Sequence, residues 1–539
     1  MSRVTAEPPA SVSGWAPLRR PVFRALWLAQ FVANTGTWMQ TVGAQWLMGD
    51  LGGGALATAL VQAATTLPVF LLVVPAGALG DILDRRRLLL AGEALMCAGA
   101  AGITATTAAG RTTPTLLLGM TAVMGVGQAL SVPSFQAIQP ELVSRSEVPQ
   151  AAVLNGANVN VARAVGPAVG GLLIAATGPA ATFAFNTASF VGVLAVLYRW
   201  KRPPDHRPLG AEHVVAATRA GARYILNAPR FATVLMRSAL FMIFASGLWA
   251  LLPVVARGPL ELGAGGYGVL LGCIGIGAVA GAFVVGRLRA AIGANALVNG
   301  SMVVYGLSMF VIGAAQRPGP VLPALVAAGG AWIGVQSTLN ATAQTLLPAW
   351  TRALAYFQLV FMGGQTLGAI GWGVLAGVAG LRAAFVIPGC ALLLVAAVTT
   401  RILRLPRTSL DLSRTLVWPE PAPGPDSDSG AGPVLVEVQW RVPQSNAEAF
   451  VAAMRHVSSS RKRTGATLWG LFRDVSEPSL YVETFTVATW HEHLRQHLER
   501  GTVWDRELEA AARALTMDGT EPTVRHFIWA NAVPPAPDQ

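Results

Sequence analysis

The chain has 539 residues, of which 53% are hydrophobic and only 12% are charged, and its formal net charge is +12. Soluble domains carry about 25% charged residues, so the composition excludes a disordered protein and disfavours an ordinary soluble enzyme. A bilayer would accommodate this much apolar surface. The positive charge also fits a nucleic-acid-binding protein, and the positions of the charges must decide between these classes.

A polar N-terminal arm, residues 1–21, precedes a series of long apolar runs. A helix needs about 20 residues to cross the hydrocarbon core of a bilayer. Cutting the runs at charges, Gly and Pro predicts twelve transmembrane helices in two groups of six. The first group occupies 22–199, with spans at 22–48, 55–79, 88–109, 114–138, 150–176 and 179–199. The second occupies 231–403, with spans at 231–256, 266–287, 294–315, 320–346, 353–378 and 381–403.

The loop charges predict the orientation of these spans. Most Lys and Arg residues fall in loops on one side, and the other side holds only Arg111, Arg257, Arg317 and Arg382. Because basic loops stay in the cytoplasm, we expect a multi-pass protein of the plasma (inner) membrane with both termini cytoplasmic. The longest loop, 200–230, divides the two groups. The basic loops on the cytoplasmic side account for the positive net charge, so nucleic acid is not an expected partner.

The C-terminal region has a soluble composition. A linker at 404–433, rich in Pro, Gly, Ser and Asp, leads to a domain at 434–530 and a short tail at 531–539. Strand-like runs lie near 434–442, 466–474, 479–487 and 523–529, with helical runs at 445–462, 488–497 and 501–516. This βαββαβ order predicts a ferredoxin-like α+β domain. The expected fold class is therefore an all-α polytopic membrane protein with a C-terminal ferredoxin-like domain.

Two motifs lie at specific positions in the first six spans. The loop after the second span reads GALGDILDRRRLLL, in which an Asp can bind a helix N-terminus and an Arg can pair across a gate. Its motif residues are Gly77, Asp81, Arg85 and Arg86. The fifth span contains VGPAVGGLL, whose glycines allow close helix contact while its Pro removes a backbone donor. Its motif residues are Gly166, Pro167, Gly170 and Gly171.

These motifs resemble those of the major facilitator superfamily. Together with FRALWLAQFVANTGTWMQTVGAQWLM (23–48) and NGANVNVARAVGPAVGG (155–171), they resemble its enterobactin-exporter-like branch, the transmembrane secretion effectors. The resemblance covers about 15–405, and the tail segment WHEHLRQHLERGTVWDRE (490–507) is similar to the C-terminal appendage of longer members. It implies export of a small organic molecule, such as a siderophore or an antibiotic, driven by an ion gradient. Nothing in the residue spacing identifies that substrate.

Polar residues inside the apolar spans are candidates for a substrate cavity between the halves. Arg163 lies about 13 residues into the fifth span, near mid-membrane. It is expected to meet an anionic or carbonyl-rich substrate, or alternatively to bond neighbouring helix carbonyls. The other candidates are Asn34, Gln40, Asn158, Gln336, Asn340, Gln344 and Gln365. Their amides can line a cavity or hydrogen-bond between helices.

Two carboxylates are candidates for ion coupling. Glu93 lies about five residues into the third span, and Asp50 is near the outer end of the first. Either could carry a proton, although such residues more often pair with an Arg or reach toward the membrane surface. The coupling ion is expected to be H+. No GxxxxGK[ST] motif is present, which disfavours ATP-driven transport.

The C-terminal domain contains His491, His493 and His497 in an H-x-H-x3-H pattern. His493 and His497 are one helical turn apart and could bind a metal, but a solvated amphipathic helix is the expected reading. The three cysteines are far apart in apolar runs, so no metal and no cofactor is expected. The predicted function is secondary active export by alternating access rather than catalysis, with a possible homodimer through the C-terminal domain. The alternative is a membrane-anchored enzyme or sensor whose activity resides in that domain.

Overall fold

The computed structural model describes residues 13–201, 223, 225–347, 353–406, 411–413, 415, 431–517 and 520–529. The central loop, the linker and both ends of the chain therefore lie largely outside the described residues. The described chain divides into a helical unit and a second unit that contains the C-terminal domain together with the ends of α8 and α10. Each unit is described by itself.

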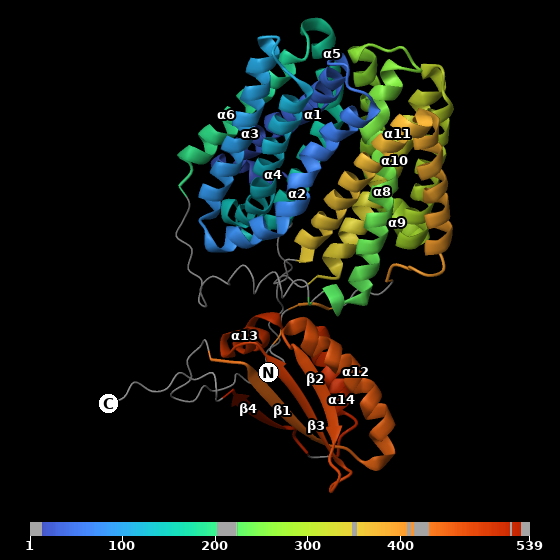
Figure 1. The fold of residues 1–539 in the computed structure, drawn as a ribbon. Helices are drawn as coiled ribbons and strands as arrows, with labels where there is room; N and C mark the ends of the chain where they lie inside the picture. The colour runs from blue at the N-terminus through green and yellow to red at the C-terminus, as the bar shows by residue number, and fades with distance from the viewer. Residues whose placement is uncertain are drawn as a thin grey trace. The chain divides into compact units, whose positions relative to one another are not determined.

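The described residues of the helical unit form ten long helices, which Figure 1 shows. They are α1 (Pro21–Asp50), α2 (Ala55–Ile82), α3 (Arg85–Ala108), α4 (Pro114–Leu142), α5 (Val148–Thr177), α6 (Ala180–Arg199), α8 (Pro229–Arg257), α9 (Ala264–Ala314), α10 (Pro318–Thr345) and α11 (Ala353–Thr399). Their ends lie within a few residues of the predicted spans, because the apolar runs stop where capping residues and charges begin. Asp84, for example, accepts a hydrogen bond from the Arg87 backbone N–H and so caps α3.

Two of these helices are each interrupted once by a glycine with positive φ. Gly293 in α9 has φ 81°, and Gly380 in α11 has φ 84°. Side-chain-bearing residues rarely adopt this conformation, and each glycine lies next to a predicted boundary between two spans. Among the described residues, nine helices are long and apolar enough to cross a membrane, and α1 is not one of these nine.

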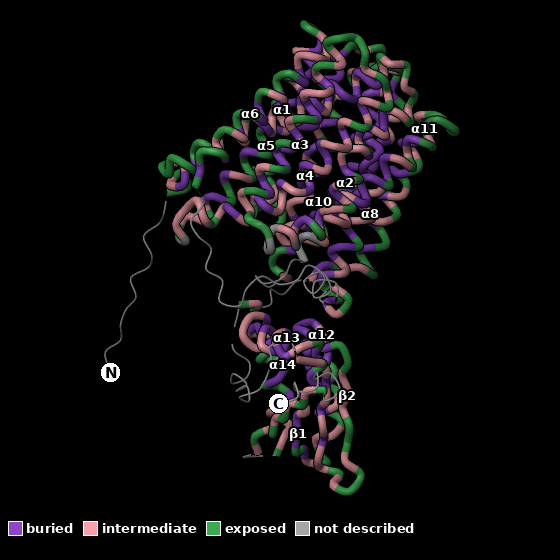
Figure 2. Tube along the Cα trace, turned by 60° about the vertical axis from the view of Figure 1, so that its left-hand side comes forward, coloured by how far each residue is buried: buried purple, intermediate pink, exposed green. Residues whose placement is uncertain are grey.

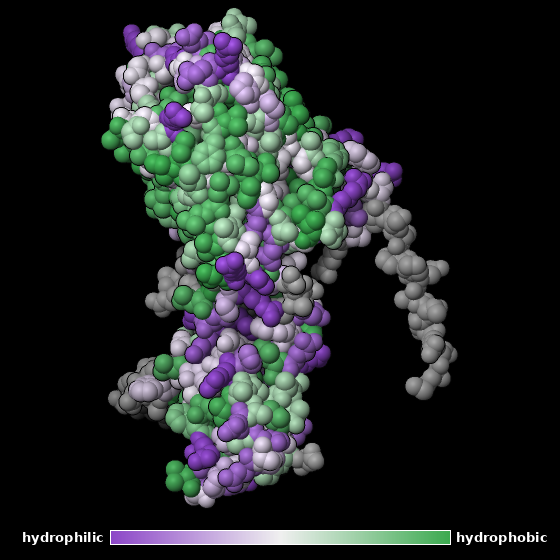
Figure 3. Space-filling model, turned by 90° about the vertical axis from the view of Figure 1, so that its right-hand side faces the viewer, coloured by the Kyte–Doolittle hydropathy of each residue, from purple (hydrophilic) through white to green (hydrophobic). Residues whose placement is uncertain are grey.

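Apolar side chains cover much of the outer surface of the helical unit, whereas hydrophilic side chains gather at its end (Figure 3). Buried positions concentrate where the helices contact one another (Figure 2). In the first half, α1, α3, α4 and α6 share one hydrophobic cluster that includes Met48, Leu117 and Phe183. An apolar exterior around a packed interior is the surface of a protein that a bilayer surrounds.

The C-terminal domain is a four-stranded antiparallel sheet with helices against it. Its main elements in chain order are β1 (Val434–Arg441), α12 (Ala447–Thr464), β2 (Leu468–Arg473), β3 (Leu480–Val487), α13 (Trp490–Arg495), α14 (Val503–Arg513) and β4 (Thr523–Ile528). A short π-helical turn, Gln496–Arg500, continues α13.

The strand order in the sheet is β2-β3-β1-β4, so β1 is central and β4 is an edge strand. Alternate residues of β1 and β3 are buried, and they form a core with α12 that includes Trp440, Phe450 and Phe485. One face of the sheet is thus covered by helices, as the period of two in these strands requires. The register also sets His526 of β4 opposite Val436 of β1.

Candidate functional site

The loop motif after α2 ties three helices of the first half together. Arg85 donates to Glu141 Oε1 at 3.2 Å and to the Ala137 carbonyl on α4 at 3.3 Å. Arg86 donates to the carbonyls of Leu197 and Tyr198, at 2.9 Å and 2.7 Å, at the end of α6. These carbonyls lack intrahelical partners, and a cation there also opposes the negative end of the helix dipole. Gly77 has open space around it, and the side chain of Asp81 lies outside the described residues.

The motif in α5 forms two closely packed surfaces. A Cβ at Gly166 would lie 2.6 Å from the Trp38 Cβ, and one at Gly170 would lie 2.9 Å from the Met39 Cα, both on α1. On another face, a Cβ at Gly171 would lie 2.5 Å from the Cα of Gly268 on α9. Pro167 is buried beside these glycines. The motif therefore lets α5 approach both α1 and the second half at backbone distance.

An aromatic cluster lies where helices of the two halves meet. Trp38 of α1 is 5.8 Å from Trp249 of α8, and Trp249 is 5.4 Å from Trp332 of α10. Trp332 in turn lies 6.3 Å from Phe361 of α11. These are ring-centroid distances at which aromatic side chains attract one another.

Arg163 of α5 joins this cluster. Its guanidinium carbon is 5.5 Å from the centre of the Trp38 ring, within cation–π range. Its Nε is buried and makes no hydrogen bond to any residue in the described part of the chain. A half-buried cation beside Trp38, at one end of an aromatic cluster that both halves form, is suited to binding an anionic or carbonyl-bearing aromatic ligand.

The predicted amides of the first half bond to one another and to backbone. Asn34 donates to Asn158 Oδ1 at 3.0 Å, and Asn158 donates to the Trp27 carbonyl at 2.9 Å, which links α1 to α5. Gln40 accepts a bond of 2.6 Å from Asn186 of α6. In this conformation these amides form hydrogen bonds between helices. This is the second of the two roles that the sequence allowed for them, the first being to line a cavity.

The predicted amides of the second half lie on α10 and α11. Gln336, Asn340 and Gln344 follow one face of α10, and Gln344 donates to Asn340 at 3.4 Å. Exposure rises along this row, from half-buried Gln336 to exposed Gln344. Gln365 of α11 is buried at 9% exposure.

The two coupling candidates have different surroundings. Glu93 of α3 is only 2% exposed, and its Oε2 has no hydrogen-bond partner in the described chain. Asp50 forms an ion pair of 2.9 Å with Arg257, which joins the end of α1 to the end of α8. The Arg257 guanidinium also lies 4.1 Å from the centre of the Trp46 ring. Asp50 is thus held by a basic partner at the helix ends, whereas Glu93 lies inside the helical unit beside Ser131 of α4.

Sequence reasoning did not predict the contacts of two other buried polar residues, Arg237 and Gln45. Arg237 of α8 is fully buried and bonds to Asn295, Asn299 and the Leu403 carbonyl. Gln45 of α1 accepts a bond of 2.6 Å from the Tyr267 hydroxyl of α9 and donates to the Trp249 carbonyl. An Arg inside an apolar run was a usable signal for Arg237, but the contacts of Gln45 depend on helix packing that one sequence does not reveal.

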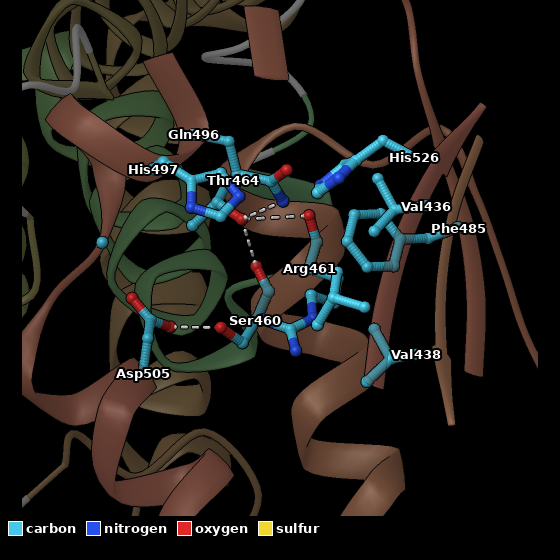
Figure 4. A pocket seen from close by; sticks show the side chains of 12 residues that line it. Val436, Val438, Ser460, Arg461, Thr464, Phe485, Gln496, His497, Asp505 and His526 are labelled. Atoms are coloured by element: carbon cyan, nitrogen blue, oxygen red, sulfur yellow. Dashed lines mark hydrogen bonds between the residues drawn. The ribbon is translucent and has the colours of Figure 1, made fainter. Parts of the chain in front are cut away.

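The C-terminal domain contains a small pocket between its sheet and α12. Apolar residues of the sheet line one side, and polar residues of α12 and the π-helical turn line the other (Figure 4). Ser460 donates to Asp505 at 2.6 Å, and Gln496 donates to Thr464 at 2.9 Å, so hydrogen bonds hold the polar wall. Arg461 is bonded to Glu483 and lies in an ion pair with Glu509, each at 3.1 Å. These two carboxylates raise the pKa of Arg461, although burial opposes them.

The expected solvated helix around His493 and His497 is wrong. His493 is 0% exposed, because its ring packs against Trp490 of the same helix and His526 of β4, and His497 lines the pocket. Burial is the main cause that lowers the pKa of His493 to about 3, with neighbouring histidines adding to it. Burial likewise lowers the pKa of His497 to about 4. Both rings are therefore neutral at pH 7. His491, which sequence reasoning grouped with them, is not part of this cluster.

Comparisons with known proteins agree with this arrangement. Residues 12–533 match the family model of transmembrane secretion effectors. Enterobactin exporter EntS of Shigella boydii serotype 18 is 27% identical over 273 residues, which is 50% of this chain and 64% of that protein. EntS of Escherichia coli O1:K1 is 26% identical with the same coverage. The match therefore spans less than two thirds of the length of these relatives.

Solved structures share the fold at low sequence identity. The nucleoside transporter NupG aligns with a TM-score of 0.58 and 12% identity, over 70% of this chain and 99% of that one. A bacterial homologue of the human lysosomal transporter Spinster, in an inward-facing and unoccupied conformation, aligns with a TM-score of 0.56 and 13% identity. That alignment covers 71% of this chain and 96% of the other. The fold of the helical unit is thus that of multi-pass membrane transporters.

Proposed function

The chain belongs to the transmembrane secretion effector family, and we propose on this premise that it exports a small amphipathic organic molecule across the plasma membrane. The family and the relatives are those of a membrane transporter and not of an enzyme. Similarity to enterobactin exporters favours a siderophore or a comparable aromatic metabolite, such as an antibiotic, as the cargo.

The transport cycle that we propose is alternating access by two six-helix halves. We count α1 as a span and divide α9 at Gly293 and α11 at Gly380, which makes twelve spans. With this even number, both termini are proposed to lie in the cytoplasm. The backbone contact between Gly171 and Gly268 supports a tight, separable interface between the halves. The Asp50–Arg257 ion pair joins the halves at the helix ends opposite the Arg85 motif, so we assign it to the outer gate and the motif to the inner gate.

The observation that carries the proposal is the position of Arg163. The side chain lies beside Trp38 in a cluster to which α1, α8, α10 and α11 contribute aromatic rings. Substrate sites of two-fold transporters lie between the halves near mid-membrane. An anionic or carbonyl-rich cargo would pair with Arg163 while its rings stack on the tryptophans. Gln336, Asn340, Gln344 and Gln365 remain candidates for the second-half wall, and Asn34, Gln40 and Asn158 for the first.

We further propose that proton movement drives export, with Glu93 as the carrier. Its burial and its unbonded Oε2 support this role better than the surroundings of Asp50, which is already paired with Arg257. Carboxylates inside membrane helices commonly serve as proton relays, and Glu93 would load and release a proton as access alternates.

For the C-terminal domain we propose a ferredoxin-like fold that forms homodimers or senses a ligand. The βαββαβ order and the antiparallel sheet β2-β3-β1-β4 support the fold. The pocket that residues of the sheet, α12 and the π-helical turn line favours ligand sensing as a second candidate function for this domain. Catalysis there is the remaining alternative.

The test is accumulation of siderophores, antibiotics and dyes in an efflux-deficient host, with and without a protonophore. Cells that express the chain should accumulate less of at least one compound, and the protonophore should abolish the difference. Unchanged accumulation of every compound would leave the family assignment standing and refute export of these cargo classes.

Substitutions at Arg163 and Trp38 then test the assigned site. Arg163→Ala should reduce transport with the protein still present in the membrane, and Arg163→Lys should restore part of it because it keeps the charge. Trp27 is a matched aromatic control on α1, since it stacks on Phe31 instead of joining the central cluster. Trp38→Ala should therefore impair transport more than Trp27→Ala, and equal effects would contradict the assigned site.

A further inference from the structure

The two halves of the C-terminal domain bring three histidines together at one end of its cavity. His493 belongs to α13, His497 to the π-helical turn after it, and His526 to the edge strand β4. One nitrogen from each ring lies within 4.8 Å of the others. Figure 4 shows His497 and His526 approaching the cavity from opposite sides. From this geometry we propose that His493, His497 and His526 bind a divalent transition-metal ion, with Zn²⁺ as the best match.

The unused ring nitrogens support this site. His493 is 0% exposed, yet its Nε2 has no hydrogen-bond partner among the residues that the structure describes. The Nε2 of His526 is also buried and unbonded within the same residues. Buried polar atoms are normally satisfied, so two unbonded imidazole nitrogens in one cluster indicate a missing ligand. Imidazole is the side chain that Zn²⁺, Cu²⁺ and Ni²⁺ share as a preferred ligand.

A hydrogen-bond chain prepares the ring of His493 for coordination. Gln496 donates its amide nitrogen to Thr464 Oγ1 at 2.9 Å, which turns its amide oxygen toward His493 Nδ1 at 3.3 Å. The Nδ1 atom is therefore the protonated one, and Nε2 carries the lone pair. Metal-bound histidines are usually oriented in this way by an acceptor on the other nitrogen.

The three histidine nitrogens must move slightly closer together to coordinate one ion. With Zn–N bonds of about 2.0 Å, two ligands of a tetrahedral ion lie about 3.3 Å apart. The three nitrogens would each move by about 1 Å or less from a cluster of this size. His526 lies on an edge strand and His497 on a short π-helical turn, and both side chains can turn without disturbing the sheet.

The surrounding charges permit a cation. Arg461 lies near these rings, but Glu483 and Glu509 both form ion pairs with it. The positive charge of Arg461 is thus more than balanced by the two carboxylates. With three protein ligands, the fourth position of the ion would open into the cavity and accept water or an oxygen-bearing small molecule.

Direct metal binding by the full-length chain tests the proposal. The protein is purified in detergent with an affinity tag that lacks histidine, stripped with a chelator and titrated with Zn²⁺ or Co²⁺. We expect one ion per chain, and for Co²⁺ the intense visible absorption of a tetrahedral complex. No stoichiometric binding of either ion would overturn the proposal.

Four variants locate the site. Loss of a residue that only orients a metal ligand weakens metal binding by about 10–100-fold. His497→Gln and His526→Gln each remove a ligand, so each should weaken Zn²⁺ binding by at least this factor. Gln496→Leu should weaken it by about 10–100-fold without removing a ligand. His491→Gln is the matched control, because it changes a histidine of the same helix outside the cluster. Binding that falls equally in the control, or persists undiminished in both ligand variants, would also overturn the site.

Thermal unfolding measures metal binding to the folded chain without a transport assay. A ligand that binds only the native state stabilises it, so Zn²⁺ should raise the unfolding temperature of the C-terminal domain. The increase should vanish in His526→Gln, whose edge-strand position makes it the variant with the least disturbance of the core. An equal increase in that variant would refute coordination by His526.

Discussion

Replacing Gly171 by alanine is the sharpest test of the interface between the halves. The new Cβ would lie 2.5 Å from the Cα of Gly268, where nonbonded carbon atoms need about 3.5 Å or more. Relief requires α5 and α9 to separate by about 1 Å along their contact. Overpacking of this kind costs about 1–3 kcal/mol. If only one conformer of the transport cycle has this contact, a cost of this size lowers the population of that conformer by about 5–150-fold.

Gly156 is a matched control on the same helix. A Cβ there meets nothing within 4 Å, so Gly156→Ala changes the same residue type without a clash. Both variants gain a similar amount of helix propensity, about 1 kcal/mol, and the difference between them isolates the interface. We expect a lower unfolding temperature and slower transport for Gly171→Ala than for Gly156→Ala in purified, reconstituted protein.

The reciprocal substitution completes the test. A Cβ at Gly268 would lie 2.8 Å from the Gly171 Cα, so Gly268→Ala should reproduce the loss. If Gly171→Ala and Gly268→Ala are as stable and as active as Gly156→Ala, the helices do not meet at backbone distance. The reasoning from the α5 motif would then fail.

Two further predictions concern the C-terminal domain of the full-length chain. Arg461→Met leaves Glu483 and Glu509 buried without their cation and should destabilise the domain by about 3–5 kcal/mol. Arg441→Met, at an exposed ion pair with Glu477, should cost less than about 1 kcal/mol; equal losses in hydrogen-exchange protection would contradict the burial argument. In metal-free protein, the lowered pKa of His493 should make the domain less stable in acid. Its contribution is complete above the unfolded-state pKa of about 6.5 and is lost as the pH falls toward about 3, amounting to about 2 kcal/mol at pH 5. Exchange protection of β1 that does not change between pH 7 and pH 5, after correction for intrinsic rates, would refute this.

The helix positions could be predicted from the sequence because a membrane span must meet a length requirement. Apolar runs between charges and helix-breaking residues matched the helices to within a few residues, and the predicted breaks near 293 and 380 coincide with glycines of positive φ. Those breaks are hard to recognise in the sequence because the loops there are very short. Apart from the two glycines, α9 and α11 each run on as one continuous helix. The strands of the C-terminal domain were equally readable because a period of two is visible locally.

The contacts of the candidate sites could not be predicted in the same way. Trp38 and Trp249 are 211 positions apart, and no local pattern indicates that their rings meet. The H-x3-H spacing of His493 and His497 is visible, but the third histidine joins them only through the pairing of β4 with β1. A helix pattern alone also suggested solvent exposure for these residues, whereas tertiary packing buries them.

Three arginines inside the two units differ in the groups that surround their charge. Arg237 uses its terminal nitrogens on Asn295, Asn299 and a backbone carbonyl, and Arg461 is held by two carboxylates. In both cases the chain supplies the acceptors that a buried charge requires. Arg163 is different, because its described contact is the face of the Trp38 ring and not a set of hydrogen-bond acceptors. A cation–π contact of about 1–2 kcal/mol does not offset the desolvation of a guanidinium. The guanidinium is thus left for water or an anionic cargo to solvate, which supports the proposed role of Arg163 in binding and releasing substrate.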